Sequence, residues 1–248
     1  MYRLRRKAGS RIAGVALMGL ALGCGDAEGP TGDPVSDEAR LLQLLEPLDE
    51  ELRDEIFHDD PEVRWGAVSQ VRDHLPPGDA LTALELLYAR DGNGDVRKEL
   101  IDEVARGGGP RAVGLLEQVA LSRDEPNVRE HALYLLGSDE NYKLVNLERM
   151  RELLWKPKGN PELQFDALRL LLKDRSTEEV HSILKKVAAT HPHPDVREVA
   201  VGTMRAHISA DLLPFLRQRL DEEEAKFVRD TIQHTIKTIE KADGATSV

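Results

Sequence analysis

One short phrase recurs along the chain at an almost constant spacing, and it constrains the fold more than any other feature. Its copies read DPEVR at 60–64, NGDVR at 93–97, EPNVR at 125–129, NPELQ at 160–164, HPDVR at 193–197 and AKFVR at 225–229. The fourth residues of the copies are Val63, Val96, Val128, Leu163, Val196 and Val228, at steps of 33, 32, 35, 33 and 32 residues. Self-similarity at such a period predicts a solenoid of stacked supersecondary units.

Each copy of the phrase has the features of a helix start. Its first residue is usually polar, as in Asp60 and Asn93, and such a side chain can accept a hydrogen bond from a free backbone amide. Pro occupies the second position in four of the six copies, where its missing N–H costs nothing in a first helical turn. An acid such as Glu62 or Asp195 suits the positive end of the helix dipole. The phrase therefore predicts six helix N-termini.

Positions four and eight residues beyond the fourth residue of the phrase are apolar in every copy. They are Ala67, Leu100, Ala132, Ala167, Ala200 and Ile232 at +4, and Val71, Val104, Leu136, Leu171, Met204 and Ile236 at +8. Only 40% of the chain is hydrophobic, so an unbroken apolar set is not expected from composition. Residues at i, i+4 and i+8 form one stripe of a helix, so each phrase should open an amphipathic helix with one buried face.

The D-P-x-V-R opening resembles the second helix of a HEAT-like repeat, of the short kind also found in phycocyanobilin lyase-type proteins. The resemblance covers about residues 37–242 and implies an all-α, HEAT-like α-solenoid of about six two-helix repeats. A period near 33 also suits tetratricopeptide and ankyrin repeats. Their signatures, W-x2-L-G-x2-Y and T-P-L-H-x-A, are absent from the sequence. Such repeats serve scaffolds, adaptors and a few enzymes, so the resemblance indicates a fold rather than an activity.

The first helix of each later unit should lie between two phrases. We expect these helices near 79–90, 110–122, 142–156, 177–190 and 210–220. In the first unit, Ser36 is the candidate N-cap and Pro47 should kink or divide the helix. The fourth unit is the least regular, because its connection at 138–141 is longer and its phrase ends in Gln164 instead of Arg. Residues 37–242 then form the repeat domain, and 243–248 a disordered tail.

The N-terminus has the pattern of a signal peptide. Residues 1–11 hold five basic residues and no acid, and residues 12–23 are apolar or small, a stretch too short to span a bilayer as a helix. The sequence from Leu20 to Cys24 resembles a bacterial lipobox, which implies cleavage after residue 23 and lipidation of Cys24. An uncleaved anchor and an ordinary secretory signal are the alternatives.

Cys24 is the only cysteine in the chain, and lipidation would explain its presence in an exported protein. Acyl chains on this residue would hold the protein on a membrane without a transmembrane helix. Residues 24–36 are rich in Gly, Pro and acids, and we expect them to form a flexible tether.

The charge of the chain bears on its partners. The formal net charge is −11, and it becomes −16 when the five basic residues of 1–23 are removed. An acidic protein is repelled by nucleic acid, so we expect no nucleic-acid partner.

The Arg that closes most copies of the phrase can be interpreted in two ways. These residues are Arg64, Arg97, Arg129, Arg197 and Arg229. The resemblance implies a structural Arg that pairs with an acid in the preceding turn, and Asp59, Asp91, Asp124 and Glu224 are candidates. The fourth and fifth units lack this acid, so the row should be broken there. The alternative is a row of Arg side chains that clamps an anionic ligand.

The outward face of the phrase helices should line a groove, as the resemblance implies. Two residues beyond each fourth residue stand Trp65, Lys98, Glu130, Phe165, Glu198 and Asp230, and six beyond it Ser69, Asp102, Tyr134, Arg169, Gly202 and His234. Only 4% of the chain is aromatic, so three large rings opposite the core stripe are unexpected. Exposed aromatics often anchor interfaces. Trp65, Tyr134, Phe165 and Arg169 are the candidate partner-binding residues. Alternatively, Trp65 packs under the N-terminal cap and Phe165 under the irregular fourth unit.

Other chemistry has little support in the sequence. Asp91 to Asp95 has the spacing of a calcium loop, but Val96 stands where an EF-hand requires Gly. His191 and His193 lie in a turn between helices with no third ligand nearby in the sequence. The signatures H-E-x-x-H and G-x-S-x-G and the phosphate-binding loop are absent. We therefore expect no metal, cofactor or catalytic residue.

These observations predict a non-enzymatic, lipid-anchored scaffold of the bacterial cell envelope that binds another envelope protein or a peptide. The alternatives are a lyase-type HEAT-like enzyme acting on a bound cofactor, and a purely structural lipoprotein. A deep pocket with converging titratable groups would favour the enzyme, and a shallow groove the scaffold.

Overall fold

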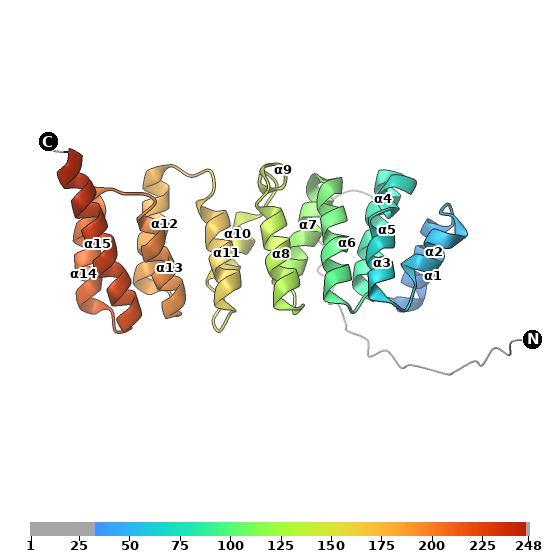
Figure 1. Cartoon of the computed structure of the whole chain (residues 1–248), viewed down its shortest axis with the longest axis horizontal. Helices are drawn as coiled ribbons and strands as arrows, with labels where there is room; N and C mark the ends of the chain where they lie inside the picture. Colours follow the sequence, from blue (N-terminus) through green and yellow to red (C-terminus); the bar gives the residue numbers. More distant parts are fainter. Residues whose placement is uncertain (1–32, 247–248) are drawn as a thin grey trace, which may run out of the picture.

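The computed structural model describes residues 33–246, and this range contains helices and no β-strand (Figure 1). The helices are α1 Pro34–Leu45, α2 Glu50–Ile56, α3 Pro61–Val68, α4 Val71–His74, α5 Pro77–Arg90, α6 Gly94–Gly107, α7 Gly109–Leu121, α8 Pro126–Leu136, α9 Asp139–Tyr142, α10 Leu147–Leu154, α11 Pro161–Leu172, α12 Thr177–Thr190, α13 Pro194–Met204, the 3-10 helix η1 Ala210–Leu212, α14 Leu213–Glu222 and α15 Lys226–Thr246. The predicted all-α solenoid is confirmed.

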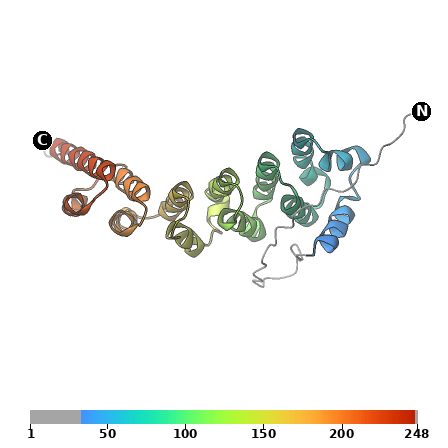
Figure 2. The ribbon, with the colours of Figure 1, turned by 90° about the horizontal axis from the view of Figure 1, so that it is seen from below.

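The helices pack as antiparallel hairpins that follow one another along the chain. α5 packs on α6, α7 on α8, α10 on α11, α12 on α13 and α14 on α15. The second helices of the hairpins also contact one another in the order α3, α6, α8, α11, α13, α15. Seen end-on, the hairpins form an elongated array with two rows of helices, and α1 and α15 lie at its opposite ends (Figure 2). One side of the second-helix row is therefore left facing solvent.

The core lies between the two rows, and the apolar stripe of the phrase helices fills it. All twelve residues at +4 and +8 are buried, the most exposed being Ile236 at 9%. Of the six fourth residues of the phrases, Val63 alone is half-buried and the others are buried. Val63 belongs to the first unit, which has a neighbouring hairpin on one side only. The periodicity therefore identified the buried face correctly.

The phrase starts a helix in each copy, but its first residue caps the helix in only some of them. The side chains of Asp60, Asn93 and Asn160 accept hydrogen bonds from backbone amides of the first turn. Glu125 and His193 occupy the N-cap position without such a hydrogen bond. This difference agrees with the strong preference for Asp, Asn, Ser and Thr at N-caps.

Two predicted boundaries differ from the structure. The first helix begins at Pro34 and is capped by Asp33, whose carboxylate accepts from the amide of Val35, rather than by Ser36. The last three residues of the expected tether are therefore helical, because Asp33 and Pro34 provide an N-cap and an N1 proline. At the other end, α15 continues to Thr246 through residues expected to be disordered.

The irregular regions fall where the sequence indicated. The first unit is divided between α1 and α2 around Pro47, as predicted. The fourth unit begins with the short helix α9, and its main first helix α10 starts only after Asn146, which accepts from the amides of Glu148 and Arg149. The expected helix near 142–156 is thus shorter, Leu147–Leu154, and the additional helix α9 precedes it.

The predicted signal peptide, the predicted lipidation site Cys24 and most of the predicted tether lie outside the described residues. Within residues 33–246, none of the helices has the length and apolar character that crossing a membrane requires.

Candidate functional site

A hollow on the second-helix row lies over α8, α11 and α13. It is an open groove of about 750 Å³, within the usual size range of ligand pockets. Tyr134 of α8, Phe165 and Arg169 of α11, and Val199 and Thr203 of α13 are among its lining residues. We call it the α8–α11–α13 groove. Three of the four candidate partner-binding residues therefore line one surface.

The aromatic residues of the groove differ in burial. Tyr134 is 65% exposed, and its ring stacks on His131 with the ring centroids 6.2 Å apart. His131 in turn lies 3.0 Å from a carboxylate oxygen of Asp102 on α6. Phe165 is partly buried and packs against the core. Tyr134 thus presents most of its ring to solvent, whereas Phe165 belongs to both the groove and the core.

The cations of the groove are held by neighbouring groups. Arg169 forms an ion pair with Asp166 one turn earlier in α11, at 2.9 Å, yet its side chain is 61% exposed. Lys173 donates to the carbonyl of Gly137 at 2.5 Å and lies 2.7 Å from the carboxylate of Asp139. Its ammonium group therefore ties the end of α11 to the end of α8, while Arg169 remains accessible.

Carboxylates crowd the junction of α8 and α11 beside the groove. Burial, followed by repulsion from Glu162, raises the pKa of Glu130. Burial also raises the pKa of Asp166, and Arg169 partly offsets this effect. The charged form of each acid is disfavoured by desolvation and by its like-charged neighbours. Glu130, Glu162 and Asp166 thus form an acidic cluster beside the groove.

Trp65 lies on the same row of helices but outside the groove. It is 49% exposed on α3, and its side chain lies near the carboxylate of Glu99 on α6. Burial is the main reason why the pKa of Glu99 is raised, and the nearby Trp65 side chain acts against it. The expected grouping of Trp65 with the other aromatics is therefore not found, because its indole contacts the neighbouring unit instead.

The recurring Arg residues bridge consecutive units. Arg64 holds Asp91 through two hydrogen bonds of 2.7 and 3.1 Å, and Arg97 lies 2.5 Å from Asp124. Each acid belongs to the turn of the following unit, 27 residues later. The expected pairing of Arg64 with Asp59 and of Arg97 with Asp91 is wrong, because each guanidinium reaches forward.

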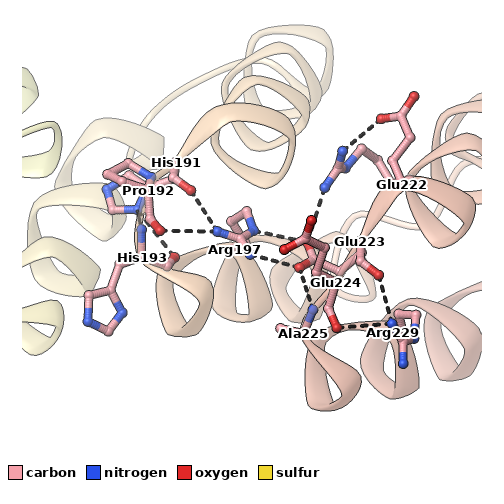
Figure 3. Close-up of polar contacts among 10 residues, drawn as sticks. His191, Pro192, His193, Arg197, Glu222, Glu223, Glu224, Ala225 and Arg229 are labelled. Atoms are coloured by element: carbon pink, nitrogen blue, oxygen red, sulfur yellow. Dashed lines mark hydrogen bonds and ion pairs between the residues drawn. The ribbon is translucent and has the colours of Figure 1, made fainter.

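The same bridge is present near the C-terminus (Figure 3). Arg197 binds the Glu223 carboxylate through hydrogen bonds of 2.9 and 2.7 Å and also donates to the carbonyl of His191. The hydrogen bonds from Arg197 are the largest cause of the low pKa of Glu223, about 2, and the amide of Ala225 and the charge of Arg219 lower it further. Arg229 donates to the carbonyls of Glu223 and Glu224. We call the three forward ion pairs the arginine ladder.

The ladder is interrupted in the middle of the chain. The residue 27 positions after Arg129 is Lys156, and the residue 27 positions after Gln164 is His191, so neither offers a carboxylate. Arg129 donates to the carbonyl of Ala120 at 3.0 Å, and burial lowers its pKa. A break was predicted at the fourth and fifth units, but the fifth unit's Arg197 is paired. The break lies one unit earlier.

No set of three or more His, Cys, Asp or Glu side chains among residues 33–243 is arranged to hold a metal ion. Asp91, the first residue of the candidate calcium loop, is bound to Arg64. The imidazole of His191 is buried, with Nε2 2.8 Å from the carbonyl oxygen of Leu154. Both motifs are thus used in contacts between units.

Several groove residues were missed by the sequence analysis. Val199 and Thr203 stand three and seven residues beyond Val196, and both line the groove. Our columns at +2 and +6 follow only the outward side of each helix. The sequence nevertheless contained one indication. The +6 residue of α13 is Gly202, which has no side chain, so the side chains that line the groove on α13 come from another row of that helix.

Comparisons with known proteins found solved structures of low similarity. The chain matches no protein-family model and no curated protein. A solved structure of an engineered protein is 19% identical, with a TM-score of 0.36, over 77% of this chain and 96% of that chain. Human deoxyhypusine hydroxylase, solved with glycerol, is 16% identical, with a TM-score of 0.29, over 84% of this chain and 97% of that chain. Likeness at this level carries no argument about fold or activity.

Proposed function

We propose that this chain is a HEAT-like, non-enzymatic scaffold that binds another protein or a peptide in the α8–α11–α13 groove. The observation that carries the proposal is Tyr134, a large aromatic side chain that is 65% exposed at the edge of an open, largely apolar groove. Aromatic residues and Arg dominate the binding energy of protein interfaces. Tyr134, Phe165 and Arg169 supply these residue types on one surface.

The proposal includes the place where the scaffold acts. Cys24, lipidated after export, would hold the protein on a membrane of the bacterial cell envelope, so that the partner is another envelope protein. The lone cysteine at the end of a lipobox-like sequence supports this part of the proposal.

The proposal can be tested by capturing partners from membranes with the intact lipoprotein and identifying them by mass spectrometry. The test variant is Tyr134→Ala, and the matched control is Trp65→Ala, which removes an exposed ring outside the groove. We expect Tyr134→Ala to weaken the recovered interaction by about tenfold to a hundredfold, the usual effect of truncating an aromatic anchor. Trp65→Ala should leave the interaction unchanged.

Thermal melts of the same samples separate binding from folding. Tyr134→Ala should leave the melting temperature close to that of the wild type, because so much of the ring is in solvent. Phe165→Ala should lower both binding and stability, because Phe165 also packs on the core. Normal recovery of every partner with Tyr134→Ala, Phe165→Ala and Arg169→Ala would contradict the proposal.

A further inference from the structure

The α8–α11–α13 groove lies over the part of the solenoid where the arginine ladder is interrupted. Elsewhere a buried or nearly buried carboxylate joins one unit to the Arg of the unit before it, as in the Arg64–Asp91, Arg97–Asp124 and Arg197–Glu223 pairs. Both missing ion pairs fall at the junctions that the groove spans, from α8 to α11 and from α11 to α13. The groove and the interruption thus share the same helices.

The junction between α11 and α13 has a weak replacement for the missing ion pair. Gln164 is 1% exposed, and its Nε2 donates to the carbonyl of Lys156, within its own unit, at 3.0 Å. Its Oε1 atom is buried without a hydrogen-bond partner. His191 reaches back to the preceding unit by one hydrogen bond, to the carbonyl of Leu154 at 2.8 Å. His191 also lies against Trp155 of that unit, with the ring centroids 5.1 Å apart. One hydrogen bond and one ring contact therefore stand where Arg197 and Glu223 form two charge-assisted hydrogen bonds.

Helix packing shows the same difference. α11 packs less extensively against α13 than α8 packs against α11 or α13 packs against α15. In a solenoid each unit contacts only its neighbours, so the stiffness of the array at one junction depends on the contacts made there. A junction with less packing and without its ion pair is the one that bends most easily.

We infer that Gln164 and His191 make the α11–α13 junction the joint at which the solenoid bends, and that this joint sets the width of the groove. α11 supplies Phe165 and Arg169 on one side of the joint, and α13 supplies Val199 and Thr203 on the other. A change in the angle between the two units moves these side chains apart or together. Gln164 and His191 are therefore positioning residues of the groove, although neither lines it.

The test measures distances between pairs of spin labels by double electron–electron resonance in full-length protein that carries Cys24→Ser. One pair, Glu152→Cys with Ser182→Cys, spans the joint on exposed positions of α10 and α12. A second pair, Glu140→Cys with Arg205→Cys, spans the groove. The control pair, Ala89→Cys with Gln118→Cys, spans the junction of α5 and α7, where the Arg97–Asp124 pair is intact. We expect a broader distance distribution across the joint than across the control junction.

Two ladder variants supply the causal test. The double variant Gln164→Arg/His191→Asp places an Arg and an acid 27 residues apart, as in the Arg64–Asp91 pair. It should narrow the distance distributions across the joint and across the groove. The distance distribution of the control pair should not change. Arg97→Gln with Asp124→Asn removes an existing pair and should broaden the control distribution. Even when the first variant does not fold, this reciprocal variant tests whether a ladder pair stiffens the junction that it spans, and a control distribution that stays equally narrow would overturn the inference.

The inference would be overturned if the distance distributions across the joint and across the control junction had equal widths in protein with the natural ladder residues. A folded Gln164→Arg/His191→Asp protein whose distributions are as broad as before would also overturn it. The inference rests on the proposed function only in treating the groove as a binding site. Its failure is distinguishable, because the distances require no partner, whereas the proposed function is decided by partner recovery with Tyr134→Ala.

Discussion

The carboxylate of Glu223 allows the stability contributed by one ion pair of the arginine ladder to be measured. Its side chain is 1% exposed, and its carboxylate accepts hydrogen bonds from Arg197, from Arg219 and from the amide of Ala225. These contacts lower its pKa from 4.5 to about 2 in the folded protein. The shift corresponds to about 3 kcal/mol of folding free energy, at about 1.4 kcal/mol for each pKa unit.

The sign of the pH dependence follows from the direction of the shift. A carboxylate with a depressed folded-state pKa stabilises the folded protein fully above its unfolded-state pKa, near 4.5. This contribution is lost as the pH falls from about 5 towards the folded-state value of about 2. Glu223→Gln removes the titrating group, so the difference in stability between wild type and variant should be about 3 kcal/mol at pH 7 and should shrink progressively below pH 5.

Urea denaturation followed by circular dichroism at a series of pH values measures this difference. Every other acid titrates in both proteins, so subtracting the variant from the wild type isolates Glu223. Glu224→Gln is the matched control, because that residue is exposed and contributes its backbone carbonyl to Arg229, and surface changes usually alter stability by less than about 0.5 kcal/mol. A stability difference between wild type and Glu223→Gln that stays constant between pH 7 and pH 3 would refute the assignment of a lowered pKa to Glu223.

Three further predictions concern the ladder, the core and the anchor. Arg97→Gln leaves the Asp124 carboxylate, whose side chain is 4% exposed, without its cation and should cost about 3 kcal/mol in urea denaturation. Arg129→Gln should lower the free energy of unfolding by only about 1 kcal/mol, because Arg129 donates to a backbone carbonyl rather than to a carboxylate. Equal losses in Arg97→Gln and Arg129→Gln would show that the forward ion pair adds no stability. Leu136→Asp places a charge at a fully buried position and should abolish the native melting transition, so a near-wild-type melting temperature would mean that the stripe is misassigned. Cys24→Ser should move the protein from membranes to the soluble envelope fraction, and a variant that stays membrane-bound after a high-salt wash would rule out the lipid anchor.

The helices and the core were predictable because the information for them is local. An apolar residue at +4 and +8, such as Ala132 and Leu136, faces the same way whatever the neighbouring units do. Caps follow the same logic, since Asp60 and Asn93 bond amides two or three residues away. The start of α1 was misplaced for the opposite reason, because the sequence offers two capping residues, Asp33 and Ser36, and local preference does not choose between them.

Contacts between units were harder to predict, because the period does not say in which direction a side chain reaches. Arg64 has an acid nearby in sequence, Asp59, and another one unit later, Asp91, and the structure uses the second. The groove shows the same limit. Tyr134, Phe165 and Arg169 were found because they point outward from their own helices. Val199 and Thr203 were missed because their place in the groove depends on how α13 lies against α11.

The forward direction of the ladder has a consequence for how such an array can grow or shrink by duplication and loss of units. A unit of this kind carries an acid before its phrase and an Arg at the end of it, so a copy inserted between α6 and α7 would meet a matching Arg upstream and a matching acid downstream. The fourth unit lacks both groups and is not exchangeable in this sense. At the C-terminal end, Arg229 donates to the carbonyls of its own turn, as Arg64 does, but within the described residues no later unit follows it with an acid. The array therefore has a polarity, and a unit added after α15 would find a guanidinium already in place.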